Sequence, residues 1–342
     1  MKNRIKKWAL GLLGTTLALS LAACGGSSSS PEPKQGEQKE SAANGEKVTI
    51  GISQIVEHAS LDAAKKGFID YLADNGYKEG EQVTYDFQNA QNDMNTATSI
   101  AQKFAGDKVD LILAIATPSA QSAAQATKDI PILFTAVTDP VVAKIVGSMD
   151  KPGANVTGTS DMNPIKEQLS LIKEIRPEAK KVGVIYNSGE ANSVVQIDIA
   201  KKVAPELGLE LVERTITNSS EVKQAADSLA NVDAIYVPTD NVVVSALDSV
   251  LMVAEKGKIP VVAAEGDSVK NGALITYGID YYELGKQTGA MAVKVLKGEA
   301  KPADMPVETQ KDLKLIINKK SAERFGVTLP EELLSRANEV IE

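Results

Sequence analysis

Hydroxyl and carboxyl side chains gather in this sequence directly after short apolar runs that are typical of strands. The hydroxyls stand where helices are expected to begin, and together with free backbone N–H groups they would suit a carboxylate. The carboxylates of Asp240 and Glu265 would suit an ammonium group. An amino-acid zwitterion would satisfy both sets, so we expect these residues to bind one. The candidates are Ser53, Glu57, Thr117, Ser119 and Thr138 in the first half of the chain, and Asn187, Asn192, Thr239, Asp240 and Glu265 in the second half.

Helix capping is the alternative role for the same residues. Ser, Thr, Asp and Asn are the preferred residues at helix N-caps, so many of them would occur at these places without any ligand. Asp and Asn at strand ends also suit the recognition of hydroxyl groups, which leaves sugars and nucleosides as alternative ligands.

Catalytic chemistry finds little support in the residue types. His58 is the only histidine and Cys24 the only cysteine, so the chain has no Cys/His cluster for a metal site. The sequence contains no G-x-S-x-G nucleophile motif, no phosphate-binding loop and no clear dinucleotide fingerprint. We therefore predict no catalytic residues, no metal and no cofactor. A pair of carboxylates could still be catalytic, and an enzyme would have to use such a pair or His58. If the protein is not an enzyme, His58 is either a pocket residue or a solvated loop residue.

Composition and charge set the broad class. The chain has 342 residues, of which 43% are hydrophobic and 24% charged, enough for a substantial core and most simply for two domains. The formal net charge is −8, and there is no basic stripe outside the first seven residues. The sequence thus gives no attraction to phosphate backbones, and we expect no nucleic-acid partner.

Short β-branched runs alternate with longer stretches of helical period from residue 47 onward. The first such runs are Val48 to Ser53, Val83 to Gln88, Leu111 to Ala116 and Ile132 to Ala136. This alternation predicts an α/β fold with parallel sheets. Continuous apolar runs such as Leu111 to Ala116 are typical of strands that are buried on both faces.

The pattern occurs twice. Val109 to Ala114 returns as Val232 to Val237, and Ile130-Pro131-Ile132-Leu133 returns as Ile259-Pro260-Val261-Val262. The repeat distance of about 125 to 130 residues predicts two similar doubly wound lobes. Ligands of open parallel sheets bind beyond the carboxyl ends of the strands, so two facing lobes would form a cleft between their polar turns.

The N-terminal segment has the features of an export signal. Lys2, Arg4, Lys6 and Lys7 precede an apolar run from Trp8 to Ala23 that is too short to span a membrane comfortably. Residues 1–23 are therefore predicted to be a signal peptide, and residues 24–46, rich in Gly, Ser, Pro and Glu, a flexible tether. Leu21-Ala22-Ala23-Cys24 resembles a bacterial lipobox, which implies lipidation of Cys24 and a position at the cell membrane. An ordinary signal peptide is the alternative.

Taken together, the turn sequences resemble ABC-importer substrate-binding lipoproteins of the tryptophan/tyrosine type, which are related to the periplasmic binding protein type 1 fold. The resemblance covers roughly residues 47 to 320 and rests on Gly51-Ile52-Ser53-Gln54, Glu57-His58, Ala116 to Gln121, Phe134 to Pro140, Asn155 to Asp161, Tyr186 to Ser193, Pro238 to Asn241 and Tyr282 to Gly285.

The resemblance implies a non-enzymatic receptor outside the cytoplasm that traps an aromatic amino acid, tryptophan or tyrosine, and hands it to an ABC permease. It also implies interleaved lobes, with residues 47–160 plus 274–299 in one and 161–273 plus 300–342 in the other. The hinge between them would contain Thr159, Ser160, Asp161 and Gly278. A sensory co-receptor lipoprotein is the alternative function.

Four aromatic residues near strand ends could stack on an aromatic ligand, although packing in the core or at an interface is the more common role for each. They are Phe134, Tyr186, Tyr236 and Tyr277.

Overall fold

The first of two sheets is built mainly from the N-terminal half of the chain. The computed structural model describes residues 47–342, so the predicted signal peptide, tether and lipidated Cys24 lie outside the described residues. This sheet has six strands in the order β11-β5-β4-β3-β1-β2, which pair in parallel. They are β1 (Val48–Gln54), β2 (Val83–Asn89), β3 (Leu111–Ile115), β4 (Ile132–Thr135), β5 (Val156–Ser160) and β11 (Glu308–Thr309).

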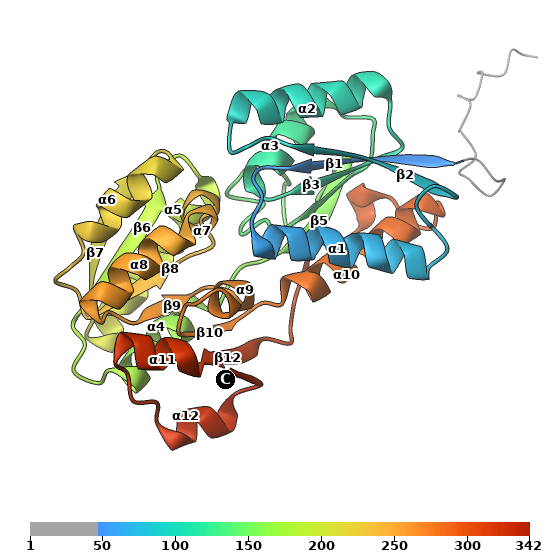
Figure 1. The fold of residues 1–342 in the computed structure, drawn as a ribbon. Helices are drawn as coiled ribbons and strands as arrows, with labels where there is room; N and C mark the ends of the chain where they lie inside the picture. The colour runs from blue at the N-terminus through green and yellow to red at the C-terminus, as the bar shows by residue number, and fades with distance from the viewer. Residues whose placement is uncertain (1–46) are drawn as a thin grey trace, which may run out of the picture. The chain divides into compact units, whose positions relative to one another are not determined.

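Helices cover both faces of this sheet, which explains the continuous apolar run of β3, where every residue is buried. Helices α1 (Ala59–Asp74) and α10 (Tyr281–Leu296) lie on one face, and α2 (Met94–Asp107) and α3 (Thr117–Ala126) on the other (Figure 1). The short 3₁₀ helix η3 (Pro302–Asp304) precedes β11. We call this part of the chain the first lobe.

The second lobe is built on a seven-stranded sheet in the order β13-β12-β10-β9-β8-β6-β7. Its strands are β6 (Lys181–Asn187), β7 (Glu210–Ile216), β8 (Ala234–Val237), β9 (Val261–Ala263), β10 (Ile275–Gly278), β12 (Lys314–Asn318) and β13 (Glu339–Ile341). The pairing of β10 with β12 is antiparallel and the others are parallel.

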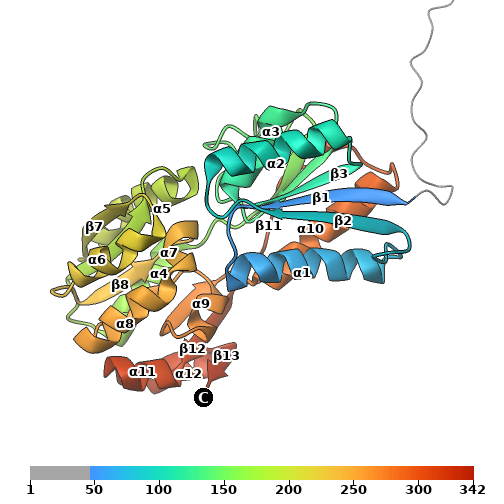
Figure 2. The same cartoon turned by 45° about the horizontal axis from the view of Figure 1, so that its top comes forward.

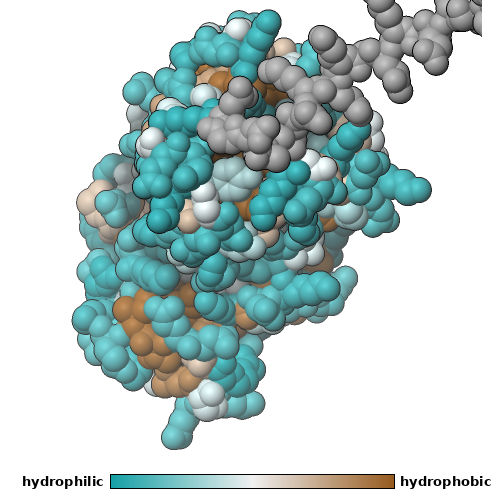
Figure 3. Space-filling model, turned by 90° about the vertical axis from the view of Figure 1, so that its right-hand side faces the viewer, coloured by the Kyte–Doolittle hydropathy of each residue, from teal (hydrophilic) through white to brown (hydrophobic). Residues whose placement is uncertain are grey.

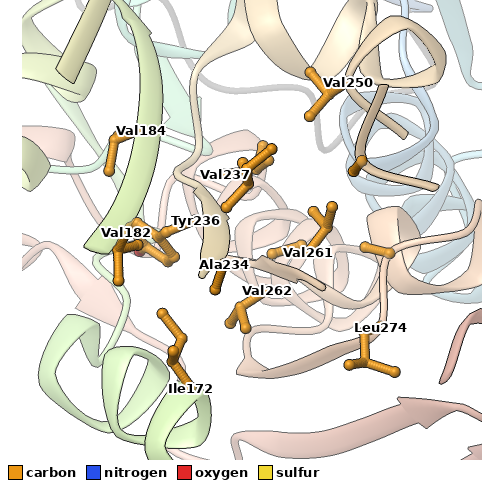
Figure 4. Packing of buried hydrophobic residues seen from close by; sticks show 14 of the residues in the cluster. Ile172, Val182, Val184, Ala234, Tyr236, Val237, Val250, Val261, Val262 and Leu274 are labelled. Carbon is orange, nitrogen blue, oxygen red and sulfur yellow. The ribbon is translucent and has the colours of Figure 1, made fainter. Parts of the chain in front are cut away.

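The helices of the second lobe are α4 (Ile165–Ile175), α5 (Ala191–Val203), α6 (Val222–Asp227), α7 (Asn241–Ser245), α8 (Leu247–Gly257), α9 (Gly266–Lys270), α11 (Lys319–Phe325) and α12 (Glu331–Arg336), with 3₁₀ turns η1 (Ala204–Leu207) and η2 (Ser219–Glu221). Figure 4 shows how Ile172 of α4, Val182 of β6 and Tyr236 of β8 meet in the core of this lobe. The predicted class, two doubly wound α/β lobes, is confirmed.

Within residues 47–342 the chain crosses between the lobes at residues 161–164, 279–280 and 310–313. Two predicted boundaries differ from this. Strand β10, expected in the first lobe from residue 274, pairs with β9 and β12 in the second sheet, and β11, expected in the second lobe, pairs with β5 in the first. The reason is that an apolar, β-branched run such as Ile275 to Tyr277 would fit the interior of either sheet, so its composition does not say which one it joins.

Helices α1 and α10 run side by side beneath the first sheet (Figure 2). They approach closely because glycine occupies the contact. A Cβ atom on Gly285 would lie 1.9 Å from the carbonyl oxygen of Ala64, and one on Gly67 would lie 2.0 Å from the carbonyl oxygen of Tyr282. The packing of this helix pair thus depends on the absence of side chains at both positions.

The face shown in Figure 3 is mostly hydrophilic, with a hydrophobic area in its lower part. Among residues 47–342, no helix is both long enough and apolar enough to span a membrane.

Candidate functional site

A pocket lies where the carboxyl ends of strands from both lobes meet. The position is the one expected for open parallel sheets, because the turns after the strands supply its walls. The hydroxyl oxygens of Thr138 and Thr239 lie 3.4 Å apart and link the lobes at the pocket. The lining residues are His58, Ser60, Leu61, Ala136, Thr138, Asp161, Asn192, Thr239, Asp240, Asn241, Val244, Glu265 and Tyr281.

Charge in the pocket has one sign. Three carboxyl side chains line it, Asp161, Asp240 and Glu265, and each is at most 2% exposed. Within the described residues no lysine or arginine lines this pocket. Burial raises the pKa of all three carboxyl groups, because water no longer solvates their charged forms. The pocket therefore favours a ligand that brings a positive group.

Asp240 and Glu265 already have hydrogen-bond donors. Asp240 Oδ1 accepts from the backbone N–H of Val243 at 2.8 Å and caps α7, while Oδ2 accepts from Asn187 N at 2.6 Å and Ser193 Oγ at 2.7 Å. Glu265 caps α9 in the same way, accepting from the backbone N–H groups of Asp267 and Ser268. The capping role therefore holds for both predicted ammonium partners, although both still line the pocket.

Asp161 is different. Its Oδ2 accepts a hydrogen bond from the hydroxyl of Tyr281 at 2.5 Å, whereas its Oδ1 is buried and has no partner within residues 47–342. The sequence predicted Asp161 as a hinge residue, and it does lie in the crossing at 161–164. It is also a wall of the pocket, which the sequence did not predict.

Other polar atoms in and around the pocket are also without partners in the described part of the chain. Ser60 Oγ and Asn192 Oδ1 belong to lining residues, and the hydroxyls of Ser53, Thr117 and Ser119 lie at the end of β1 and the start of α3. Buried polar groups in folded proteins are almost always hydrogen-bonded. A cluster of unpaired ones therefore indicates a place for a ligand or for ordered water.

The backbone is strained at the same edge of the first sheet. Ala116 follows β3 with a φ of 75°, and Ala136 follows β4 with a φ of 58°. Residues other than glycine rarely adopt such angles, at a cost of about 1–3 kcal/mol each, and they tend to do so at functional sites. Ala136 is itself a lining residue.

Glu190 is a buried acid that the sequence analysis missed. Its Oε2 accepts from Asn192 Nδ2 at 2.9 Å and from Asn241 Nδ2 at 2.5 Å. Burial, with the nearby charge of Asp240, raises the pKa of Glu190 to about 8. Glu190 thus holds two asparagines, Asn192 and Asn241, that line the pocket. Its position just before α5 was the available signal, but an acid at a helix start is an ordinary capping pattern.

The ten predicted ligand-binding residues fall into three groups. Thr138, Asn192, Thr239, Asp240 and Glu265 line the pocket. Ser53, Thr117 and Ser119 are buried at the end of β1 and the start of α3 and are not lining residues. Glu57 is exposed beside a neighbouring hollow, and Asn187 lies in a turn, where its side chain accepts from Gly189 N at 2.9 Å.

Three predicted hinge residues lie at strand ends instead of within a crossing. Thr159 bonds to Thr288 inside the first lobe, with hydroxyl oxygens 2.8 Å apart, and the Ser160 hydroxyl donates to the Thr138 carbonyl at 2.8 Å. Gly278 is the last residue of β10, where a Cβ would lie 2.3 Å from the carbonyl oxygen of Ala264. Glycine at this position therefore permits a close backbone contact.

The structure also shows where His58 and the four predicted stacking residues lie. His58 lines the pocket at the start of α1, and burial lowers its pKa to about 4. The Tyr236 hydroxyl donates to Gln168 Oε1 at 2.7 Å in the core, and Phe134 is fully buried in the first lobe. None of the four predicted stacking residues is among the residues that line the described pocket, where the aromatic side chain is Tyr281.

Two parallel-sheet lobes with a buried polar pocket at their strand ends define the class of periplasmic binding protein type 1 folds. The chain belongs to the family of ABC transporter substrate-binding proteins, whose model matches residues 49–341. The prediction of a binding protein and not an enzyme is thereby confirmed. Proteins of this family act outside the cytoplasm.

Several characterised relatives are similar over most of the chain. A tyrosine-binding protein from Clostridioides difficile (strain R20291) is 51% identical over 90% of this chain and 88% of its own length. An ABC domain in complex with L-Trp from Streptococcus pneumonia is 40% identical, with a TM-score of 0.83 over 86% of this chain and 100% of that chain. The ligand-free, open structure of a substrate-binding protein with adhesive properties from Clostridium difficile is 50% identical, with a TM-score of 0.65 over 86% of this chain and 99% of that chain.

Proposed function

We propose that this protein binds an aromatic L-amino acid, tyrosine or tryptophan, in the pocket between its lobes, and delivers it to an ABC permease while anchored to the cell membrane through a lipid on Cys24. The observation that carries the proposal is the set of unpaired buried atoms in a pocket with carboxylates and, among the described residues, no lysine or arginine. Such a site suits a ligand with both an ammonium group and hydrogen-bond acceptors.

The start of α1 is suited to the ligand carboxylate. The helix is 16 residues long, and no side chain caps its first N–H groups. His58, Ser60 and Leu61 from this start line the pocket, and the Ser60 hydroxyl has no partner in the described chain. The free N–H groups and the partial positive charge at a helix N-terminus attract a carboxylate. The unpaired hydroxyls of Thr117 and Ser119 at the start of α3 could supply further donors.

The rest of the lining offers apolar surface to an aromatic side chain. Leu61, Ala136, Val244 and Tyr281 contribute apolar or aromatic surface to an otherwise polar pocket. The tyrosine-binding relative and the neighbour in complex with L-Trp support the aromatic choice.

Closure of the lobes is the proposed signal to the permease. A ligand that contacts both lobes stabilises the closed arrangement by the difference between its affinities for the closed and open forms. The TM-scores support a closed arrangement here, because the L-Trp complex scores higher than the ligand-free open structure despite its lower sequence identity.

Thermal denaturation with candidate ligands tests the proposal. We expect L-tyrosine and L-tryptophan to raise the melting temperature, and glucose, myo-inositol and uridine to leave it unchanged. In a chain with Trp8→Phe, which removes the only tryptophan, bound tryptophan should also show a blue-shifted emission. Stabilisation by a sugar or nucleoside alone would refute the aromatic ligand.

A separate experiment tests the anchor. Cells that express the chain and are fed a labelled fatty acid should incorporate the label, and Cys24→Ser should abolish the incorporation. Equal labelling of both chains would contradict lipidation at Cys24.

A further inference from the structure

We propose that Asp161 is the residue that binds the ammonium group of the ligand, and that the site therefore requires a free amino group. The inference rests on the proposed function and identifies the residue that recognises the amino group of the ligand. It replaces Asp240 and Glu265, the partners that the sequence favoured.

The surroundings of Asp161 lack a positive charge. The residue is 2% exposed, and its carboxyl group forms no ion pair within residues 47–342. One oxygen is held by the Tyr281 hydroxyl and the other makes no hydrogen bond in the described chain. A buried carboxylate is costly unless a partner compensates it. A ligand ammonium in the pocket would supply that partner.

The other buried acids near the pocket are less available. Both oxygens of Asp240 and both of Glu265 accept hydrogen bonds from helix N-termini or from neighbouring side chains. Glu190 is not a lining residue, and one of its oxygens is bonded to Asn192 and Asn241. Asp161 therefore combines contact with the pocket and an oxygen without a donor.

A second acceptor comes from the other lobe. Asn192 Oδ1 is buried and unpaired within residues 47–342, and Asn192 lines the same pocket as Asp161. An ammonium group has three N–H donors, so it could bond to Asp161 and to Asn192 together. Such a group would join the crossing segment of the chain to the second lobe.

The position of Asp161 connects ligand binding with the hinge. Asp161 begins the crossing at 161–164, and Tyr281 follows the crossing at 279–280 directly. Their hydrogen bond therefore ties two crossings to each other. A ligand that binds Asp161 acts on the segments that must rotate when the lobes close.

Titration calorimetry on the full chain tests the proposal with ligands that differ in one group. The panel contains L-tyrosine, L-tryptophan, L-leucine, tyramine, which lacks the carboxylate, and 3-(4-hydroxyphenyl)propanoate, which lacks the amino group. We expect Asp161→Asn to weaken tyrosine binding by at least about 30-fold and to leave binding of the propanoate unchanged or stronger. Asp227→Asn, at an exposed aspartate, is the matched control and should alter neither affinity.

An Asp161→Asn chain that binds the propanoate but keeps the wild-type preference for tyrosine would overturn the proposal. The wild-type chain gives a second measurement should the variant fail to fold: equal affinity for tyrosine and the propanoate would also overturn it. If leucine or tyramine binds with dependence on Asp161 while tyrosine and tryptophan do not bind, the aromatic function is wrong and the role of Asp161 is supported. If no free amine binds the wild-type chain, both proposals are wrong.

Discussion

The contact between α1 and α10 gives a sharp test of the packing that positions the pocket. In Gly285→Ala the new Cβ would lie 1.9 Å from the Ala64 carbonyl oxygen, while ordinary contacts begin at 3.4 Å, so the contact would be about 1.5 Å too short. The clash is with backbone and cannot be relieved by a rotamer change. The helices must therefore move apart, and we expect the free energy of unfolding to fall by about 1–3 kcal/mol or more.

The same movement should reach the ligand. The first turn of α1 supplies His58 and Ser60 to the pocket, and α10 begins with Tyr281. Because the two helix starts face the same site, we expect tyrosine affinity to fall together with stability. Urea denaturation followed by circular dichroism measures the first effect, and calorimetric titration the second.

The matched control is Gly106→Ala in the last turn of α2. A Cβ there meets no atom within 4 Å, so alanine should be neutral or should stabilise the chain by up to about 1 kcal/mol. If Gly285→Ala were as stable as Gly106→Ala, the close helix contact would be wrong, and with it the account of how the pocket is positioned.

Three further predictions concern buried polar groups. The pKa of Glu190 is about 8 in the folded chain against 4.5 ordinarily, so the folded state holds an extra proton and the free energy of unfolding should fall as pH rises between these values. In urea unfolding, Glu190→Gln should flatten this pH dependence by up to about 1.4 kcal/mol per pH unit, and an unchanged slope would contradict the prediction. The pKa of His58 is lowered from 6.5 to about 4, so the free energy of unfolding should fall as pH drops between these values, and His58→Gln should lessen that fall. If the wild-type and His58→Gln chains lost stability in parallel during acid titration, the prediction would be wrong. Asp240→Ala should lower the free energy of unfolding by at least about 2 kcal/mol, because Asn187 N, Val243 N and Ser193 Oγ lose their acceptor. An Asp240→Ala chain that melts at the wild-type temperature would show that these hydrogen bonds are not needed for stability.

Much of the architecture follows from patterns that are local in the sequence. The apolar run of β3 indicates a strand covered on both faces, and the repeat of Ile130 to Leu133 at Ile259 to Val262 indicates two lobes. Polar residues after strands could be placed at the pocket because parallel strands end at one edge of a sheet. Thr138, Asn192 and Thr239 do line the pocket, and their contact with a ligand stays a prediction.

The roles of the acids were harder to predict. Whether Asp240 binds a ligand or caps a helix depends on which donors reach its oxygens, and one of them, Ser193 Oγ, comes from 47 residues away. For Asp161, the sequence predicted a place at the hinge but no contact with the ligand. Its free oxygen and its bond to Tyr281, 120 residues further on, are properties of the folded chain that no local pattern contains.

Small-angle X-ray scattering of the chain, with and without saturating L-tyrosine or L-tryptophan, tests most directly whether a ligand holds the two lobes together. We predict that at least one of the two amino acids will decrease the radius of gyration. At the same concentration, 3-(4-hydroxyphenyl)propanoate should produce a smaller decrease. Identical profiles with and without each amino acid, at concentrations where calorimetry shows full binding, would contradict closure around the ligand.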